Sequence, residues 1–205
     1  MSVQDSIDKP DCFVICGSND LYVPLYAASL ISYYNPSLVI CSGGVAHTAD
    51  GLHTNWNEPE STVFTRLIKA ACPRNAVVLE DKDALNTSDN IRNAIKITDG
   101  FRLFRDVCFI HKPFMTRRLR LTVEKQFPAL SCRIIGSTIS FDDYAKTVRD
   151  VDNLINIIVG DMDRIMKYPS LGYTERIDIN SDVAVAFEYL VNNGYNRHTL
   201  TISIP

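Results

Sequence analysis

The sequence predicts an α/β protein with a mainly parallel sheet that is covered by helices on both faces. Short apolar runs alternate with segments of helical periodicity, and this alternation favours parallel strands joined by right-handed crossovers. The runs are continuously apolar, as expected for fully buried strands. The chain has 205 residues, of which 46% are hydrophobic, so it can bury one full core. The predicted strands cover residues 12–16, 38–41, 76–79, 107–110 and 132–135.

Helix signals separate these predicted strands. Residues 22–34 place small and apolar side chains at helical spacing and are stopped by Asn35-Pro36. The second helix is expected to start near Pro59, because proline is tolerated in a first turn. Thr87 is expected to be the N-cap of the third helix, and residues 114–127 form the fourth. Helices on both faces of one sheet predict a three-layer sandwich.

The alternation ends after Gly136, where helices follow one another. Residues 147–166 carry a continuous apolar stripe at helical spacing, and residues 182–192 form another helix. The stripe is expected to pack in the core; the alternative is that it forms the interface of a homodimer. We therefore expect a polar N-terminal segment at 1–10, an α/β core at 11–138 and a C-terminal helical portion at 139–205 packed on that core.

Charge and hydropathy exclude several classes of partner. A net charge of −3 argues against a nucleic-acid surface, because phosphate neutralisation needs clustered Lys and Arg. The densest basic cluster, Arg117-Arg118-Leu119-Arg120, is short and suits one anionic group. No apolar run approaches the roughly 18 residues of a membrane span, and no secretory signal is evident. We expect no nucleic-acid partner, no membrane partner and a cytoplasmic location.

The six cysteines are expected to be buried thiols. Most lie within or beside the apolar runs, and none has CxxC spacing. A cytoplasmic location disfavours structural disulfides. Free cysteine in a core behaves as a small hydrophobic residue, so neither a redox site nor a metal site is predicted.

Small-residue turns follow the first two strands, where a ligand crevice is expected. Parallel strands that end together form such a crevice with the following helix starts. Gly17-Ser18-Asn19-Asp20 predicts either an anion site or a plain capped turn. In Ser42-Gly43-Gly44 the paired glycines let a ligand approach the backbone, and both turns are expected to supply N–H donors. The polar loop at 45–57 is long for its position, which predicts a lid or binding loop.

Two acidic residues are expected at the same crevice. Glu60 lies at the start of the second helix, and Glu80 lies at the end of the third strand. Together they could bind ribose hydroxyls or an amine, or act as acid and base. They could also hold Mg²⁺. The alternative is a helix-dipole role for Glu60 and a surface position for Glu80.

Amide and cationic side chains follow the third and fourth strands. Two amides lie on one edge of a helix start in the motif Asn86-Thr87-x-x-Asn90. They could form hydrogen bonds with hydroxyls or with the edge of a nucleobase. Lys112 follows the fourth strand, and with Arg117 or Arg118 it suits a carboxylate or a phosphate. The alternative for this stretch is a solvated basic helix.

These motifs, in this order, resemble the family containing YdcF, SanA and ElyC, and most of all its YdcF-like branch. The resemblance covers about residues 12–195. It implies a Rossmann-like fold, a ligand crevice at the strand ends and a helical C-terminal portion. It also implies a poorly defined role that involves S-adenosylmethionine or a related nucleotide-like ligand. The resemblance rests on SGG at 42–44, Glu60, Glu80, Asn86-Thr87-x-x-Asn90, Lys112-Pro113-Phe114-Met115-x-Arg117-Arg118, Gly160-x-x-x-Arg164-x-x-x-Tyr168-Pro169 and Gly194-Tyr195.

Two functional hypotheses follow. The first is a cytoplasmic protein that binds S-adenosylmethionine or a similar nucleotide-like small molecule. The alternative is a hydrolase or transferase acting on a phosphorylated or nucleotide-linked substrate, with Mg²⁺ as a possible cofactor. The sequence identifies no catalytic residue. The expected ligand-binding residues are Gly17, Ser18, Asn19, Asp20, Ser42, Gly43, Gly44, Glu60, Glu80, Asn86, Thr87, Asn90, Lys112, Arg117 and Arg118.

Overall fold

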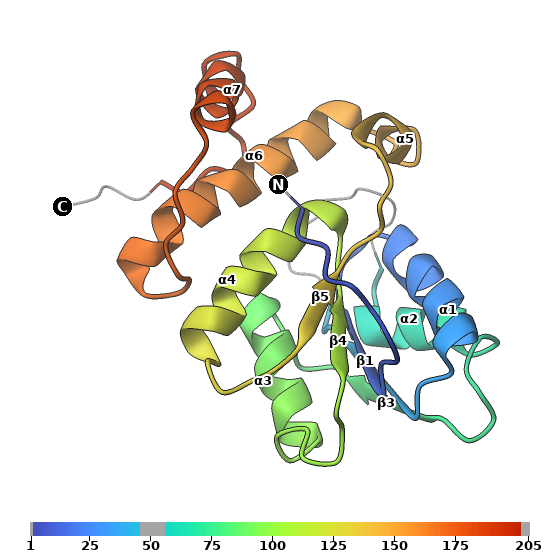
Figure 1. Ribbon diagram of the computed structural model, residues 1–205. Coiled ribbons are helices and arrows are strands. Elements are labelled where there is room, and N and C mark those ends of the chain that lie inside the picture. The colour runs from blue at the N-terminus through green and yellow to red at the C-terminus, as the bar shows by residue number, and fades with distance from the viewer. Residues whose placement is uncertain (1, 46–55, 202–205) are drawn as a thin grey trace.

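Five parallel strands form one sheet in the order β3-β2-β1-β4-β5. The computed structural model describes residues 2–45 and 56–201. It confirms the predicted α/β class and the Rossmann-like three-layer arrangement (Figure 1). The strands are β1 (Cys12–Cys16), β2 (Leu38–Ser42), β3 (Val77–Asp81), β4 (Val107–Ile110) and β5 (Arg133–Ile135).

Helices cover both faces of this sheet, because consecutive residues of a strand point to opposite sides. Val14 and Cys16 of β1 pack with α3 (Thr87–Ile97) and α4 (Thr116–Gln126) on one face. Phe13 and Ile15 pack with α1 (Tyr22–Tyr34) and α2 (Glu60–Ile68) on the other. β1 is therefore buried from both sides, which explains its continuously apolar sequence.

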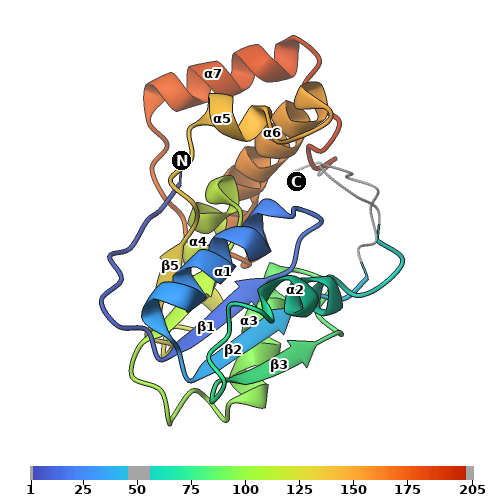
Figure 2. The ribbon, with the colours of Figure 1, turned by 90° about the vertical axis from the view of Figure 1, so that its right-hand side faces the viewer.

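The strand order reverses beside β1, which pairs with β2 on one edge and with β4 on the other. In open α/β sheets this switch point opens a crevice at the carboxyl ends of the strands. The C-terminal helices lie over that end of the molecule (Figures 1 and 2). They are α5 (Phe141–Ala145), α6 (Val151–Lys167) and α7 (Ser181–Asn192), with the short 3-10 helix η2 (Tyr168–Leu171) after α6. A second short 3-10 helix, η1 (Pro113–Met115), lies between β4 and α4.

The C-terminal portion contacts the core through α6, which packs against α4 and η1. A small apolar cluster joins Phe114 of η1, Tyr144 of α5 and Leu154 of α6. By contrast, α7 buries none of its residues and lies against α6 at the end of the molecule away from the sheet (Figure 2).

Three local expectations differ from the structure. The long helix begins at Val151 rather than at residue 147, because the Asp150 carboxylate accepts a hydrogen bond from the Asn153 N–H (2.9 Å) and caps it. The five-residue helix α5 was not expected from the sequence, since so short a segment carries little periodicity. Asn86, not Thr87, caps α3: the Asn86 Oδ1 accepts from the Asp89 N–H (3.0 Å).

The N-terminal segment protects the exposed edge of β5. The Asp5 N–H donates to the carbonyl of Ile134 (3.1 Å), and the Asp5 carboxylate accepts from the Ile134 N–H (2.7 Å). The Gln4 side chain accepts from the Gly136 N–H (3.0 Å). These contacts occupy strand groups that would otherwise be open to another chain.

All six cysteines are free thiols; the four that lie in β1, β2 and β4 are fully buried, whereas Cys72 and Cys132 are partly buried. Burial raises the pKa of Cys12 and Cys41 to about 12, so these thiols are protonated and unreactive. Within the described ranges, no helix is both long and apolar enough to cross a membrane.

Candidate functional site

A cavity of about 360 Å³ opens where the sheet ends beneath α6. Its wall combines the turns after β1, β2 and β4, the first residues of α2 and α3, and one face of α6. Most of the residues expected from the sequence meet here, although they are spread over about half the chain. Those that line the cavity are Gly17, Ser18, Asn19, Gly43, Gly44, Glu60, Asn86, Thr87, Asn90, Lys112 and Arg118.

The floor of the cavity is the contact between the Gly17 and Gly43 turns. A β-carbon added to Gly17 would lie 2.7 Å from the Gly43 Cα and 2.7 Å from the Ser42 carbonyl oxygen. It would also lie 2.5 Å from Oε2 of Glu60. Both turns must therefore lack side chains for the two strands to end together with the Glu60 carboxyl group above them.

The backbone N–H groups of Gly43 and Gly44 are not available to a ligand, because they form hydrogen bonds within the protein. The Gly43 N–H donates to the Asp81 carbonyl (2.9 Å), and the Gly44 N–H donates to the Ala84 carbonyl (2.8 Å). These bonds join β2 to the segment after β3. The expectation that these two residues offer backbone donors to a ligand is therefore wrong, and their role is to leave space.

Glu60 is the first residue of α2, and its carboxyl group faces the cavity. Its backbone N–H donates to the Gly44 carbonyl (3.0 Å), which fixes the helix start over the second turn. Burial raises the pKa of Glu60 to about 7, and the nearby charge of Lys112 partly offsets this effect. The side chain forms no hydrogen bond or ion pair with any residue in the described ranges.

Lys112 contributes a buried cation that is also without an anionic partner. The residue is 9% exposed, and its Nζ lies 5.4 Å from the centre of the Phe114 ring. In the part of the chain that the structure describes, its ammonium group forms neither an ion pair nor a hydrogen bond. A buried ammonium group is costly unless it is paired. An anionic ligand would supply the missing partner.

Three further polar atoms at the cavity have unused hydrogen-bonding capacity. Ser18 Oγ, His111 Nδ1 and Asp161 Oδ2 are buried and find no partner among residues 2–45 and 56–201. Burial and the charges of Lys112 and Arg118 hold the pKa of His111 well below its ordinary value. His111 is therefore a neutral imidazole, which donates a hydrogen bond from one ring nitrogen and accepts one at the other. Buried polar groups in proteins are normally satisfied, so these atoms favour a polar occupant.

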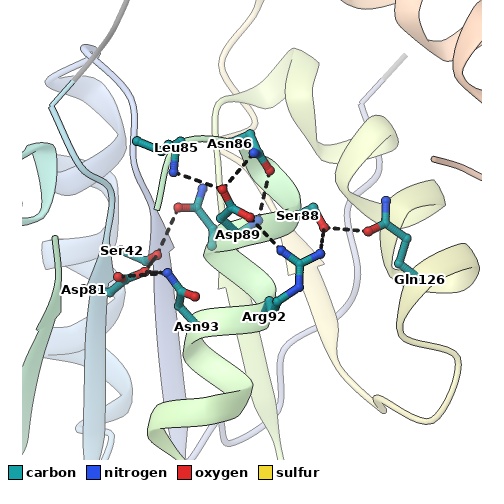
Figure 3. A network of polar contacts seen from close by, with 10 residues as sticks. Ser42, Asp81, Leu85, Asn86, Ser88, Asp89, Arg92, Asn93 and Gln126 are labelled. Atoms are coloured by element: carbon teal, nitrogen blue, oxygen red, sulfur yellow. Dashed lines mark hydrogen bonds and ion pairs between the residues drawn. The ribbon is translucent and has the colours of Figure 1, made fainter. Parts of the chain in front are cut away.

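Ser42 lies behind the cavity wall and not in it. Its hydroxyl lies 2.6 Å from Oδ2 of Asp81 and 3.0 Å from Oδ1 of Asn90 (Figure 3). The amide of Asn93 donates to both oxygens of the same carboxylate (3.1 Å each). This buried network ties the end of β2 to α3 and positions Asn90, whose side chain is in the cavity wall.

The start of α3 carries a second polar network, next to the first (Figure 3). The Arg92 guanidinium pairs with Asp89 (2.6 Å) and donates to Ser88 Oγ (3.0 Å). The Ser88 hydroxyl donates to Gln126 of α4 (2.5 Å). These bonds fix the first turn of α3 against α4, and so fix the position of Asn86 at the cavity.

Besides Ser42, three expected site residues lie outside the cavity. Glu80 is the fourth residue of β3, where it accepts from Thr62 (3.0 Å) and pairs with Lys82 (3.1 Å). Its side chain therefore points away from the crevice, because alternate residues of a strand face opposite sides. Asp20 is fully buried and accepts from the Tyr22 N–H (2.8 Å) and from the Tyr144 hydroxyl. Arg117 is in α4, but Arg118 reaches the cavity.

The separation of Glu60 from Glu80 also removes the expected pair of carboxylates. Glu60 lines the cavity whereas Glu80 does not and pairs with Lys82, so the described geometry lends no support to Mg²⁺ ligation by this pair, which stays a prediction. Across the described ranges, no group of three or more His, Cys, Asp and Glu residues could hold a metal ion.

Sequence reasoning missed the contribution of α6 to the cavity. Asp161, Arg164 and Tyr168 line it from this side. Asp161 is buried and forms a close ion pair with Arg118, and Arg164 donates to the carbonyls of Gly160 (2.8 Å) and His198 (3.0 Å). The spacing of Gly160, Arg164 and Tyr168 was the available signal, since residues four apart share one face of a helix.

The C-terminal segment also reaches the cavity, through His198. It crosses α6 so closely that a β-carbon on Gly160 would lie 2.6 Å from the His198 Cβ. Asp163 of α6 is buried, and its carboxylate accepts from the Leu200 N–H (2.7 Å) of the same segment. The predicted lid or binding loop at 45–57 lies mostly outside the described residues.

The pKa of Glu60 predicts how stability depends on pH. Between its ordinary value of 4.5 and about 7, the folded protein binds more protons than the unfolded chain. The free energy of unfolding is therefore expected to fall as the pH rises through this window. As the pH rises through this window, the free energy of unfolding of wild type should fall by about 2 kcal/mol more than that of Glu60→Gln. Urea unfolding at pH 4.5, 6 and 8 measures this difference. A difference that stays constant over this range contradicts the assignment, and Glu80→Gln should keep the wild-type decline.

Comparison with known proteins identifies a relative of similar length. The sequence is 25% identical to an uncharacterized protein of Streptomyces coelicolor over 181 residues, which cover 87% of this chain and 80% of the relative. No protein-family model matches the chain. The relative's description states no activity or ligand. Membership of the family containing YdcF therefore stays a prediction.

Proposed function

We propose that this protein binds an anionic, nucleotide-like small molecule in the cavity at the carboxyl ends of β1, β2 and β4. The observation that carries the proposal is the buried Lys112 ammonium group, which has no anionic partner in the described chain and borders the cavity. Ser18 Oγ and His111 Nδ1 add unsatisfied polar atoms to the same wall. A ligand with an anionic group and further hydrogen-bonding groups would pair with the Lys112 ammonium and with both of these polar atoms.

The other cavity residues suit the rest of such a ligand. Asn86 and Asn90 are held in place by the networks of α3 and present amides to hydroxyls or a base edge. Glu60 can accept from a hydroxyl or an amine. The volume of about 360 Å³ falls in the range of small-molecule sites. The resemblance to YdcF-like proteins makes S-adenosylmethionine the first ligand to test, and free buried thiols agree with a cytoplasmic location.

Isothermal titration tests this proposal with S-adenosylmethionine, AMP, ADP and ATP as probes. We expect saturable binding of at least one probe at one site per chain, with weaker binding at higher salt because Lys112 contributes a charge contact. Glu80→Gln should bind like wild type, since its side chain is outside the cavity. The absence of heat and of any thermal shift for all four probes at millimolar concentration would contradict the proposal.

A further inference from the structure

Glu60 and Lys112 face the same cavity without neutralising each other. The charge of Lys112 acts on the carboxyl group, yet the two side chains form no ion pair within the described residues. Several other acids of the molecule are paired: Glu80 with Lys82, and Asp161 with Arg118. Both residues line the cavity, so one ligand bound there could contact the Glu60 carboxyl and the Lys112 ammonium.

The fold makes room specifically for the Glu60 carboxyl group. Oε2 occupies the position where side chains of residues 17 and 43 would begin, 2.5 and 3.0 Å from their ideal β-carbons. The backbone of Glu60 is also fixed, by its hydrogen bond to the Gly44 carbonyl. The carboxyl group is therefore held where β1 and β2 end, and among the described residues it forms no hydrogen bond or ion pair.

The chemistry of this arrangement fits proton transfer. Proton transfer at neutral pH is most effective from a group whose pKa is near 7, and burial brings Glu60 close to that value. A group held unpaired in a polar cavity beside a cation is a candidate acid or base. Lys112 lies where it would neutralise a phosphate oxygen, as a compact point charge.

We propose that Glu60 is the general base of a hydrolytic reaction on a phosphate ester or anhydride whose phosphoryl group is held by Lys112. This inference rests on the proposed binding function and adds a reaction to it. The Glu60 carboxylate removes a proton from a water molecule, whose oxygen forms a bond to phosphorus. The phosphorus–oxygen bond to the leaving group breaks, and the leaving oxygen takes a proton from solvent. The products are inorganic phosphate or a phosphate monoester, and an alcohol or a shorter nucleotide.

The test is release of inorganic phosphate from AMP, ADP and ATP, with Mg²⁺ and with EDTA, by wild type, Glu60→Gln and Glu80→Gln. Glu60→Gln is expected to bind the same nucleotide within about threefold by titration and to lose at least about 100-fold in kcat. Glu80→Gln should keep the wild-type rate. In wild type, kcat/KM should rise with pH to a plateau, and this rise should be absent from the residual activity of Glu60→Gln.

The outcomes separate the two proposals. Nucleotide binding without phosphate release between pH 5 and 9 overturns the catalytic role and leaves the binding function standing. Equal rates of phosphate release by wild type and Glu60→Gln would likewise overturn the catalytic role and leave the binding function standing. If none of the nucleotides binds or turns over, the catalytic role fails, and the binding proposal fails with it only when S-adenosylmethionine does not bind either. A circular dichroism spectrum and a melting temperature of Glu60→Gln close to wild type show that lost turnover is not lost folding.

Discussion

Gly17→Ala is expected to lower the free energy of unfolding by about 3 kcal/mol, at the upper end of the cost of overpacking a core. The added methyl group would lie 2.7 Å from both the Gly43 Cα and the Ser42 carbonyl oxygen. These are backbone atoms of buried strand ends, so no side chain can rotate away to make room. The turns after β1 and β2 would have to separate, and ligand binding should be lost with them. Urea unfolding measures the change.

Gly194→Ala is the control for this effect. Gly194 has a φ of 92° and nothing within 4 Å of an added β-carbon. That variant tests only the backbone preference of glycine, which costs about 1 kcal/mol. A loss in Gly17→Ala no larger than the loss in Gly194→Ala would show that the two turns are not tightly packed.

Lys112→Met is expected to weaken nucleotide binding by about 100-fold, because loss of one partner of a buried charge pair typically costs 2–5 kcal/mol. Methionine retains an apolar stem against Phe114 but removes the ammonium group. The same variant should keep or increase the stability of the free protein, since it removes a buried charge that has no ion-pair partner among the described residues. Titration and urea unfolding of the same preparation measure both effects.

Lys69→Met provides the matched control, because Lys69 is exposed at the end of α2, outside the cavity. It should bind nucleotide like wild type. Lys112→Met with unchanged affinity would remove the observation on which the binding proposal depends. A large loss of stability in Lys112→Met would show instead that the ammonium group has a structural partner.

Local patterns were sufficient for most of the fold. The runs at 12–16 and 107–110 are apolar throughout, and both became central strands with helices on each side. Predicted and observed bounds of α1 agree because Asn35-Pro36 ends the helix sharply. Where the local signal was weak, as at α5 and the start of α6, the predicted bounds were wrong.

The candidate site shows the limit of such patterns. To predict whether Glu80 points into the crevice, one must know the face of the sheet on which its side chain lies. In the structure Glu80 lies within β3, which extends to Asp81, and its side chain is on the α2 side, where it accepts from Thr62. Ser42 was expected to meet a ligand, yet its hydroxyl belongs to a buried network with Asp81 and Asn90. The two strands extend one and two residues beyond their predicted ends at 41 and 79, and one residue of register changes the face on which a side chain lies.

The sequence by itself determined the α/β alternation, the glycine turns after β1 and β2, and the convergence of polar residues at the strand ends. These follow from local hydrophobic periodicity and from conformational preferences of glycine and proline, which depend on neighbours along the chain. Only the tertiary structure decided that α6 lines the cavity, that Glu80 is excluded from it, and that Glu60 and Lys112 form no ion pair with the residues that the structure describes. Contacts between distant segments and the burial of charge depend on packing in three dimensions, which no local pattern encodes.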